Sequence, residues 1–140
     1  MTAASTATAL KALIEHAAAF SSRDNRRYAD NLSLPFVHLW PDGEILRYDN
    51  RSDVDLFGHY ARAGLDAGNF GRTELDQADL ILDWDDLKAF HVKFTRFMPD
   101  DGRSSQSEAI WVAIRDGQSW KLKLRIGAAR IRQPGCNGGP

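Results

Sequence analysis

From Leu87 to Ile126 the chain reads LKAFHVKFTRFMPDDGRSSQSEAIWVAIRDGQSWKLKLRI. Apolar and polar residues alternate over Ala89–Phe97, which is the period-two pattern of a half-buried strand. The nearly continuous apolar run over Glu108–Arg115 predicts a second strand that is buried on both faces, and a third strand follows over Trp120–Ile126. Turns rich in Asp and Gly separate the three segments. This stretch therefore predicts three consecutive antiparallel strands.

The third of these segments alternates strictly. Strand parity puts its large apolar residues on one face and its cations on the other: Trp120, Leu122, Leu124 and Ile126 against Lys121, Lys123 and Arg125. No aromatic residues are interleaved with the cations on their face, as an RNA-binding surface would require. We therefore expect the basic stripe to pair with Asp79 and Asp83 across the sheet.

Upstream residues predict three helices, a hairpin and one more long strand. The expected elements are a helix over Ala7–Ser21, a short helix from Asp24 or Asn25 to about Leu32, a hairpin of Phe36–Trp40 with Glu44–Tyr48, a helix from Ser52 to about Ala67, and an extended segment over Arg72–Trp84. In that segment Ala78, Leu80, Leu82 and Trp84 share one face by parity. Helices followed by a mainly antiparallel sheet make an α+β architecture.

Composition bounds the protein class. The chain has 140 residues, 43% of them hydrophobic, which fits one domain over residues 1–132 with a Pro/Gly-rich tail over 133–140 that we expect to be disordered. Its formal net charge of −1 provides no bulk field for nucleic acid or an anionic membrane. The single cysteine, Cys136, excludes an intrachain disulfide, and no run is long enough to span a bilayer. The N-terminus lacks the apolar region of a signal peptide, so we expect a cytoplasmic protein.

Several short motifs, in this order and spacing, resemble the NTF2-like or SnoaL-like superfamily, whose fold is described as cystatin-like and is shared by ketosteroid isomerases. The motifs are Ala18–Asp24, Leu34-Pro35-Phe36, Trp40-Pro41-Asp42-Gly43, Arg96 with Asp101-Gly102, and Arg115-Asp116-Gly117 with Trp120-Lys121-Leu122. The resemblance covers about Ala7–Ala129. It implies a strongly bent, mixed and mainly antiparallel sheet wrapped around a long N-terminal helix, with three helices on the concave side, a pocket between them, and a homodimer formed through the outer sheet face.

The isomerase chemistry of this superfamily is not expected here. Ketosteroid isomerase uses an aspartate base facing a tyrosine and a protonated aspartate. Alignment of the motifs puts His16 at the tyrosine position, Trp40 at the base and Trp111 near the second aspartate. A tryptophan can neither abstract a proton nor act as a carboxylic acid. Other superfamily members are cyclases, dehydratases or non-catalytic binding and assembly domains, so the fold alone does not decide the function.

His38 is the candidate catalytic residue. It shares a strand face with Phe36 and Trp40, and an imidazole there could act as acid or base near pH 7; alternatively it is a satisfied pocket histidine. The other candidate ligand-binding residues are His16, Tyr28, Phe36, Trp40, Tyr60 and Trp111. His91 is expected on the outer sheet face. No metal-ligand spacing or nucleotide motif is present, so no metal or cofactor is expected.

Two functions remain open from these residues. The first is a homodimer that binds a small apolar or aromatic molecule, with isomerase-, cyclase- or dehydratase-like acid-base chemistry through His38. The second is a non-catalytic domain for ligand sensing or assembly. The first predicts a polar neighbour for His38 within a pocket, and the second predicts a filled interior.

Overall fold

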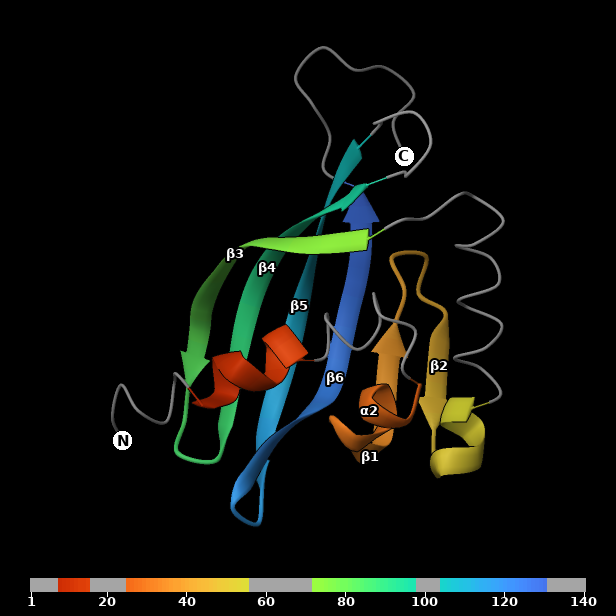
Figure 1. Ribbon diagram of the computed structural model, residues 1–140, viewed down its shortest axis with the longest axis vertical. Coiled ribbons are helices and arrows are strands. Elements are labelled where there is room, and N and C mark those ends of the chain that lie inside the picture. Colours follow the sequence, from red (N-terminus) through yellow and green to blue (C-terminus); the bar gives the residue numbers. More distant parts are fainter. Residues whose placement is uncertain (1–7, 16–24, 56–71, 98–103, 131–140) are drawn as a thin grey trace.

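The strands of the chain form one curled sheet, and helical segments lie against one of its faces (Figure 1). The computed structural model describes residues 8–15, 25–55, 72–97 and 104–130. In chain order its elements are α2 (Asn25–Asp30), β1 (Leu32–Leu39), β2 (Ile45–Tyr48), β3 (Arg72–Asp83), β4 (Leu87–Phe97), β5 (Ser104–Asp116) and β6 (Ser119–Arg130). Residues 8–15 and 51–55 are also helical. The remainder of the predicted first and third helices lies outside the described residues.

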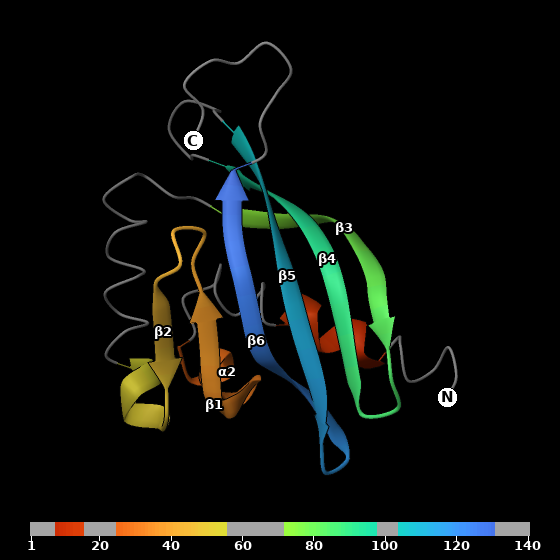
Figure 2. The same cartoon turned by 180° about the vertical axis from the view of Figure 1, so that it is seen from behind.

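Within the described residues the strand order is β2-β1-β6-β5-β4-β3. The four long strands pair as antiparallel neighbours, whereas β1 pairs antiparallel with β2 and parallel with β6. The sheet is therefore mixed and mainly antiparallel, which confirms the prediction. Register shifts along β3 coincide with the bend of that strand in Figures 1 and 2, because an extra residue in one strand bends it.

Helical residues 8–15 cover one face of the sheet, which we call the inner face. Figure 1 shows this helix in front of the sheet and Figure 2 shows it behind. Leu13 on the helix belongs to the same buried cluster as Phe90 of β4 and Trp111 of β5. Phe90 and Trp111 are cross-strand partners, so alternate residues of β4 and β5 point to the inner face. The hydrophobic core thus lies between the inner face and the helices.

β1 begins earlier than the sequence predicts. The strand was expected to start at Phe36, but it starts at Leu32, which pairs with Leu122 of β6. The Leu34–Pro35 bond is cis, and Pro35 is exposed. The register between β1 and β6 shifts between Leu32 and Val37, across the proline that has no N–H to donate.

The predicted faces of β6 are wrong because the strand contains a bulge. Val112 and Ala113 of β5 pair with Leu124 and Leu122 of β6, which leaves Lys123 as an extra residue. Alternation reverses at that point. Leu124 and Ile126 therefore lie on the outer face, while Arg125 pairs with Trp111 on the inner face.

The predicted faces of β3 and its expected ion pairs are also wrong. Leu80 pairs with Phe90 and Leu82 with Ala89, so a bulge puts Leu80 and Leu82 on opposite faces. β5 and β4 separate β6 from β3, and the stripe of cations on β6 cannot reach Asp79 or Asp83. Asp83 instead forms an ion pair with the buried Lys88.

Candidate functional site

His38 is buried on the inner face, near the end of β1. It pairs with Arg125 of β6, and its Nε2 lies in hydrogen-bonding contact with the Gly127 carbonyl oxygen. A carbonyl oxygen only accepts, so Nε2 carries the proton and Nδ1 keeps its lone pair. Burial, with the Arg125 charge second, lowers the pKa of His38 to about 4. The imidazole is therefore neutral at pH 7.

Trp40 covers His38 from the solvent side. The two rings stack with centroids 3.8 Å apart and planes 24° apart. His38 is only 7% exposed, whereas Trp40 is 37% exposed. Trp40 follows β1 directly, and its N–H donates to the Glu44 carbonyl in the hairpin turn at 2.8 Å. The hairpin therefore fixes the backbone that carries this aromatic cover.

Arg125 reaches the inner face because of the β6 bulge. Its Cζ lies 5.7 Å from the centre of the Trp111 ring, a cation–π distance. Its Nε is buried and has no hydrogen-bond partner, and burial lowers the pKa of the guanidinium. The Arg125 side chain as a whole remains partly exposed to solvent.

Arg96 of β4 is in a similar state. Its Cζ lies 5.2 Å from the centre of the Phe94 ring, and its buried Nε also lacks a partner. Burial and the neighbouring Arg125 charge lower the pKa of Arg96 to about 10. Because Arg96 also acts on the His38 charge, the three side chains form one electrostatic group. We call His38, Arg96 and Arg125 the inner cluster.

Buried aromatic residues surround the inner cluster. Phe36 and Tyr48 stack with ring centroids 5.8 Å apart, and Tyr28 is also buried. Burial, with the nearby Tyr28 second, raises the pKa of Tyr48 above its ordinary value, so its hydroxyl stays protonated. Both tyrosines act on the Arg125 charge. The site therefore combines apolar walls with a few polar tips.

The structure brings together most of the candidate residues named from the sequence. Phe36, His38 and Trp111 are buried on the inner face, Tyr28 of α2 is buried with them, and Trp40 stacks on His38. His16 and Tyr60 lie outside the described residues.

Sequence reasoning missed Arg96, Arg125 and Gly127. Strict alternation assigned Arg125 to the wrong face, since nothing in the run Lys-Leu-Lys-Leu-Arg marks Lys123 as the extra residue. Gly127 carried a usable signal. A glycine interrupts the apolar strand two residues after Arg125, and it has a positive φ of 106°.

His91 lies on the outer face, as predicted. Its Nε2 is 2.8 Å from Oε1 of Glu108, and both side chains are partly exposed. Glu108 is the cross-strand partner of Lys93 on the same face. This histidine already has a carboxylate partner and is no part of the inner cluster.

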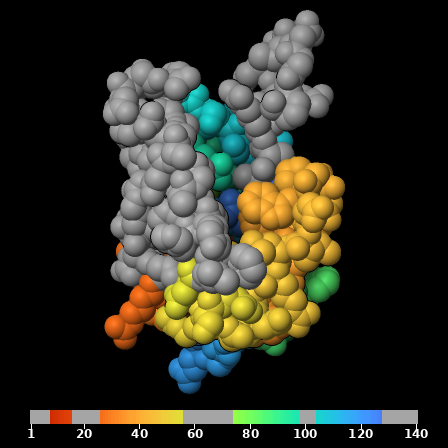
Figure 3. Space-filling model, turned by 90° about the vertical axis from the view of Figure 1, so that its right-hand side faces the viewer, coloured from red at the N-terminus to blue at the C-terminus, as the bar shows by residue number. Residues whose placement is uncertain are grey.

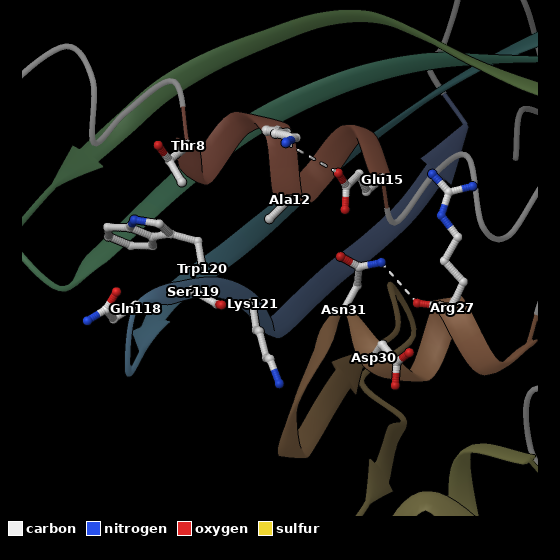
Figure 4. Close-up of a pocket in the computed structure, with 11 residues that line it drawn as sticks. Thr8, Ala12, Glu15, Arg27, Asp30, Asn31, Gln118, Ser119, Trp120 and Lys121 are labelled. Carbon is white, nitrogen blue, oxygen red and sulfur yellow. Dashed lines mark hydrogen bonds and ion pairs between the residues drawn. The ribbon is translucent and has the colours of Figure 1, made fainter.

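A cavity of about 450 Å³ opens between helical residues 8–15, α2 and the turn from β5 to β6, away from the inner cluster (Figure 4). Its lining includes charged side chains of both signs: Lys11, Glu15, Arg27, Asp30 and Lys121. Lys11 and Glu15 lie 3.9 Å apart, and the Asn31 amide donates to the Arg27 carbonyl at 2.9 Å. Exposed charges of both signs can neutralise one another in water, so we place the candidate site at the inner cluster.

Two further observations concern the described residues alone. Within these ranges no three His, Cys, Asp or Glu side chains converge as metal ligands. None of the helices described in the chain is long and apolar enough to cross a membrane.

No family model matches the sequence, and no curated protein matches it. Solved structures do match. A protein of unknown function with a cystatin-like fold from Nostoc punctiforme is 14% identical, with a TM-score of 0.73 and 96% of each chain covered. An NTF2-like protein with a cystatin-like fold from Novosphingobium aromaticivorans is 12% identical, with a TM-score of 0.71 and coverage of 96% of this chain and 86% of that one.

A third match is a putative calcium/calmodulin dependent protein kinase II association domain from Xanthomonas campestris. It is 15% identical, with a TM-score of 0.63 and coverage of 91% of this chain and 87% of that one. These likenesses confirm the NTF2-like, cystatin-like fold that the sequence motifs implied. At such low identity they establish the fold and leave the activity to be argued from the site.

Proposed function

We propose that this chain binds a small molecule with an apolar or aromatic body on the inner face of the sheet, beside His38. The observation that carries the proposal is the state of that histidine. It is buried and neutral, its Nε2–H is committed to Gly127, and Trp40 stacks on its ring. Its Nδ1 remains an acceptor for a hydroxyl or amide group of a ligand.

The same state favours binding over catalysis. An imidazole with a pKa of about 4 is unprotonated at pH 7, so it cannot serve as a general acid there. It is also a weak base. We therefore favour a binding role, in which His38 accepts a hydrogen bond from the ligand, over isomerase-, cyclase- or dehydratase-like proton transfer through His38.

A binding titration tests this proposal. Trp40 is partly exposed beside His38, so aromatic hydroxyl compounds such as phenol and naphthol should change the tryptophan fluorescence. His38→Gln keeps an N–H for the Gly127 carbonyl but moves the acceptor away from the Nδ1 position to the amide oxygen, where the ligand's donor group no longer meets it. We expect this variant to weaken binding about tenfold, the effect of one lost hydrogen bond.

His91→Gln is the matched control, because His91 lies on the outer face. Wild-type affinity is expected for this variant. Equal affinity of all three proteins, or no binding by the wild type, would show that His38 does not mark a binding site. Native mass spectrometry of protein purified without added ligand would also show any molecule already bound.

A second function, assembly with a second copy of the chain, is favoured by the outer face. There β5 and β6 carry aligned apolar pairs, Ile110 with Ile126 and Val112 with Leu124, all partly exposed. An uncharged apolar patch is self-complementary, as a twofold interface between identical chains requires. The similar protein from Xanthomonas campestris is itself named as an association domain.

Sedimentation equilibrium tests the assembly. Val112→Asp puts a charge in the middle of the apolar pairs and should convert a dimer to a monomer. Gln106→Asp adds the same charge toward the start of β5 on the same face and should leave the dimer intact. A wild type that sediments as a monomer at all concentrations rules out this assembly.

A further inference from the structure

The inner cluster places two partly buried arginines on one face of the sheet, and no described carboxylate pairs with either of them. Seven ion pairs join described residues to one another, and neither Arg96 nor Arg125 takes part in any of them. Both Nε atoms are buried and lack hydrogen-bond partners. Each guanidinium lies over an aromatic face, with its Cζ 5.2 Å from the centre of the Phe94 ring for Arg96 and 5.7 Å from that of Trp111 for Arg125.

Such a pair is unfavourable for the protein by itself. A buried charge is normally paired or fully hydrogen-bonded, because water no longer solvates it. Here the two guanidinium groups also repel each other, and His38 is kept neutral beside them. A group that brings negative charge and acceptor atoms would relieve both costs. The described part of the site is therefore complementary to an anion.

The geometry points to an oxyanion ligand: we infer that the molecule bound on the inner face carries a carboxylate or phosphate group held by Arg125 and Arg96, with an aromatic body against Trp111 and Trp40. This inference rests on the proposed function and specifies its ligand class. Arginine suits the role, since Nε–H and a terminal N–H form a fork that matches two oxygens of one anion.

Figure 3 shows a hollow beside the hairpin of β1 and β2, with atoms of β4, β5 and β6 on its floor. Tyr28 and Tyr48 lie close enough to Arg125 to act on its charge, so all three side chains belong to the same part of the inner face. Because His38 is neutral, its Nδ1 can accept a hydrogen bond from a donor group elsewhere on the ligand.

Three probes of similar size separate the contribution of the anionic group to affinity from that of the aromatic ring. Phenylacetate carries a carboxylate, phenyl phosphate carries a phosphate, and phenylacetamide is the neutral counterpart of the first. Calorimetric titration of wild-type protein should show one of the anions binding at least about tenfold more tightly than the amide, the effect expected of a charge-assisted bond. The anion that binds more tightly shows whether the natural ligand carries a carboxylate or a phosphate group.

Arg125→Met removes the charge and keeps the length of the side chain. We expect it to reduce anion affinity about tenfold or more and to leave the weak binding of phenylacetamide unchanged. Arg47→Met is the matched control, because Arg47 is exposed on β2 and pairs with Asp49. A melting temperature at or above that of wild type for Arg125→Met would show that the arginine serves the ligand rather than the fold.

A direct readout does not depend on any variant. Arginine Nε–H signals in a ¹⁵N-correlated NMR spectrum should shift for two residues when the preferred anion is added. Equal binding of anion and amide, with no Nε–H shift, overturns the oxyanion and leaves the proposed binding function standing. Failure of the three probes and of the aromatic hydroxyl compounds to bind overturns both.

Discussion

His38 and His91 lie on opposite faces of the same sheet, and their surroundings differ in kind. On the outer face His91 is 2.8 Å from a carboxylate of Glu108, and both side chains are in partial contact with water. On the inner face His38 is 7% exposed and has two arginines beside it. Among the described residues, no carboxylate forms an ion pair with this inner group.

The two faces differ in how their charged groups are paired. On the outer face His91 contacts a carboxylate, whereas on the inner face the buried Nε atoms of Arg96 and Arg125 have no hydrogen-bond partner. The outer pair satisfies its own charges, so water or a second chain can cover it at little cost. In the described part of the chain the buried Nε donors of Arg96 and Arg125 have no acceptor, and an added group with acceptor atoms would supply one. Strand parity puts the two histidines on opposite faces, and the bulge in β6 brings Arg125 to the face that carries His38.

The largest effect is expected from Gly127, which lies at a second register shift between β5 and β6 and whose carbonyl oxygen accepts a hydrogen bond from Nε2 of His38. A Cβ at this position would lie 3.0 Å from the Glu108 carbonyl oxygen and 3.2 Å from the Ala109 Cα, at a φ of 106°. Gly127→Val should therefore lower the free energy of unfolding by about 4 kcal/mol, measured by urea denaturation. Gly43→Ala is the control, because Gly43 also has a positive φ but open space around it. Equal losses for the two variants would mean that close packing at Gly127 is unimportant.

The next effect is the pH dependence of stability. The pKa of His38 is about 4 in the folded protein against 6.5 in the unfolded chain, so the unfolded state binds more protons between these values. Stability is then complete above about pH 6.5 and falls as the pH decreases toward 4, by about 3 kcal/mol. Urea titrations across this range should show the fall in wild type and in His91→Gln. His38→Gln should lose most of it, and an unchanged pH dependence in that variant would assign the effect to other groups.

The sequence was sufficient to predict an α+β fold with a mainly antiparallel sheet, and to predict the faces of the residues on β1 and β4. Alternation over Ala89–Phe97 correctly placed His91 outside and Phe90 in the core, because β4 keeps an unbroken register with β5. Strand parity likewise grouped Phe36, His38 and Trp40. These predictions need only local periodicity, which the chain itself carries.

The rest of the site depends on irregularities that periodicity does not contain. A bulge shifts every later side chain of a strand to the opposite face, and its position is set by pairing with the neighbouring strand. Arg125 was therefore assigned to the face opposite Leu122 and Leu82 to the same face as Leu80, both wrongly. The pairing of β1 with β6, which joins His38 to Arg125, is a contact between residues 87 positions apart that no local pattern indicates.

A smaller effect is expected from the aromatic cover of the inner cluster. Trp40→Ala removes a ring that stacks on His38 at 3.8 Å, so we expect a loss of about 1 kcal/mol in unfolding free energy. The His38 pKa should also rise, because water gains access to the imidazole, and NMR titration of its ring protons measures this. Trp84→Ala is the control, since Trp84 is 59% exposed in the turn between β3 and β4. A His38 pKa that stays the same in Trp40→Ala would show that Trp40 does not control solvent access.

The smallest effect is expected on the outer face. Glu108→Gln removes the carboxylate that contacts His91 but keeps the shape of the side chain, and both partners are already partly exposed. We expect a loss of about 0.5 kcal/mol, measured by thermal unfolding at pH 6 and reduced by added salt. A double-mutant cycle with His91→Gln isolates the pair from other effects of each change. A coupling of several kcal/mol would mean that water is excluded from the outer face, which is the condition a second chain seated there would create.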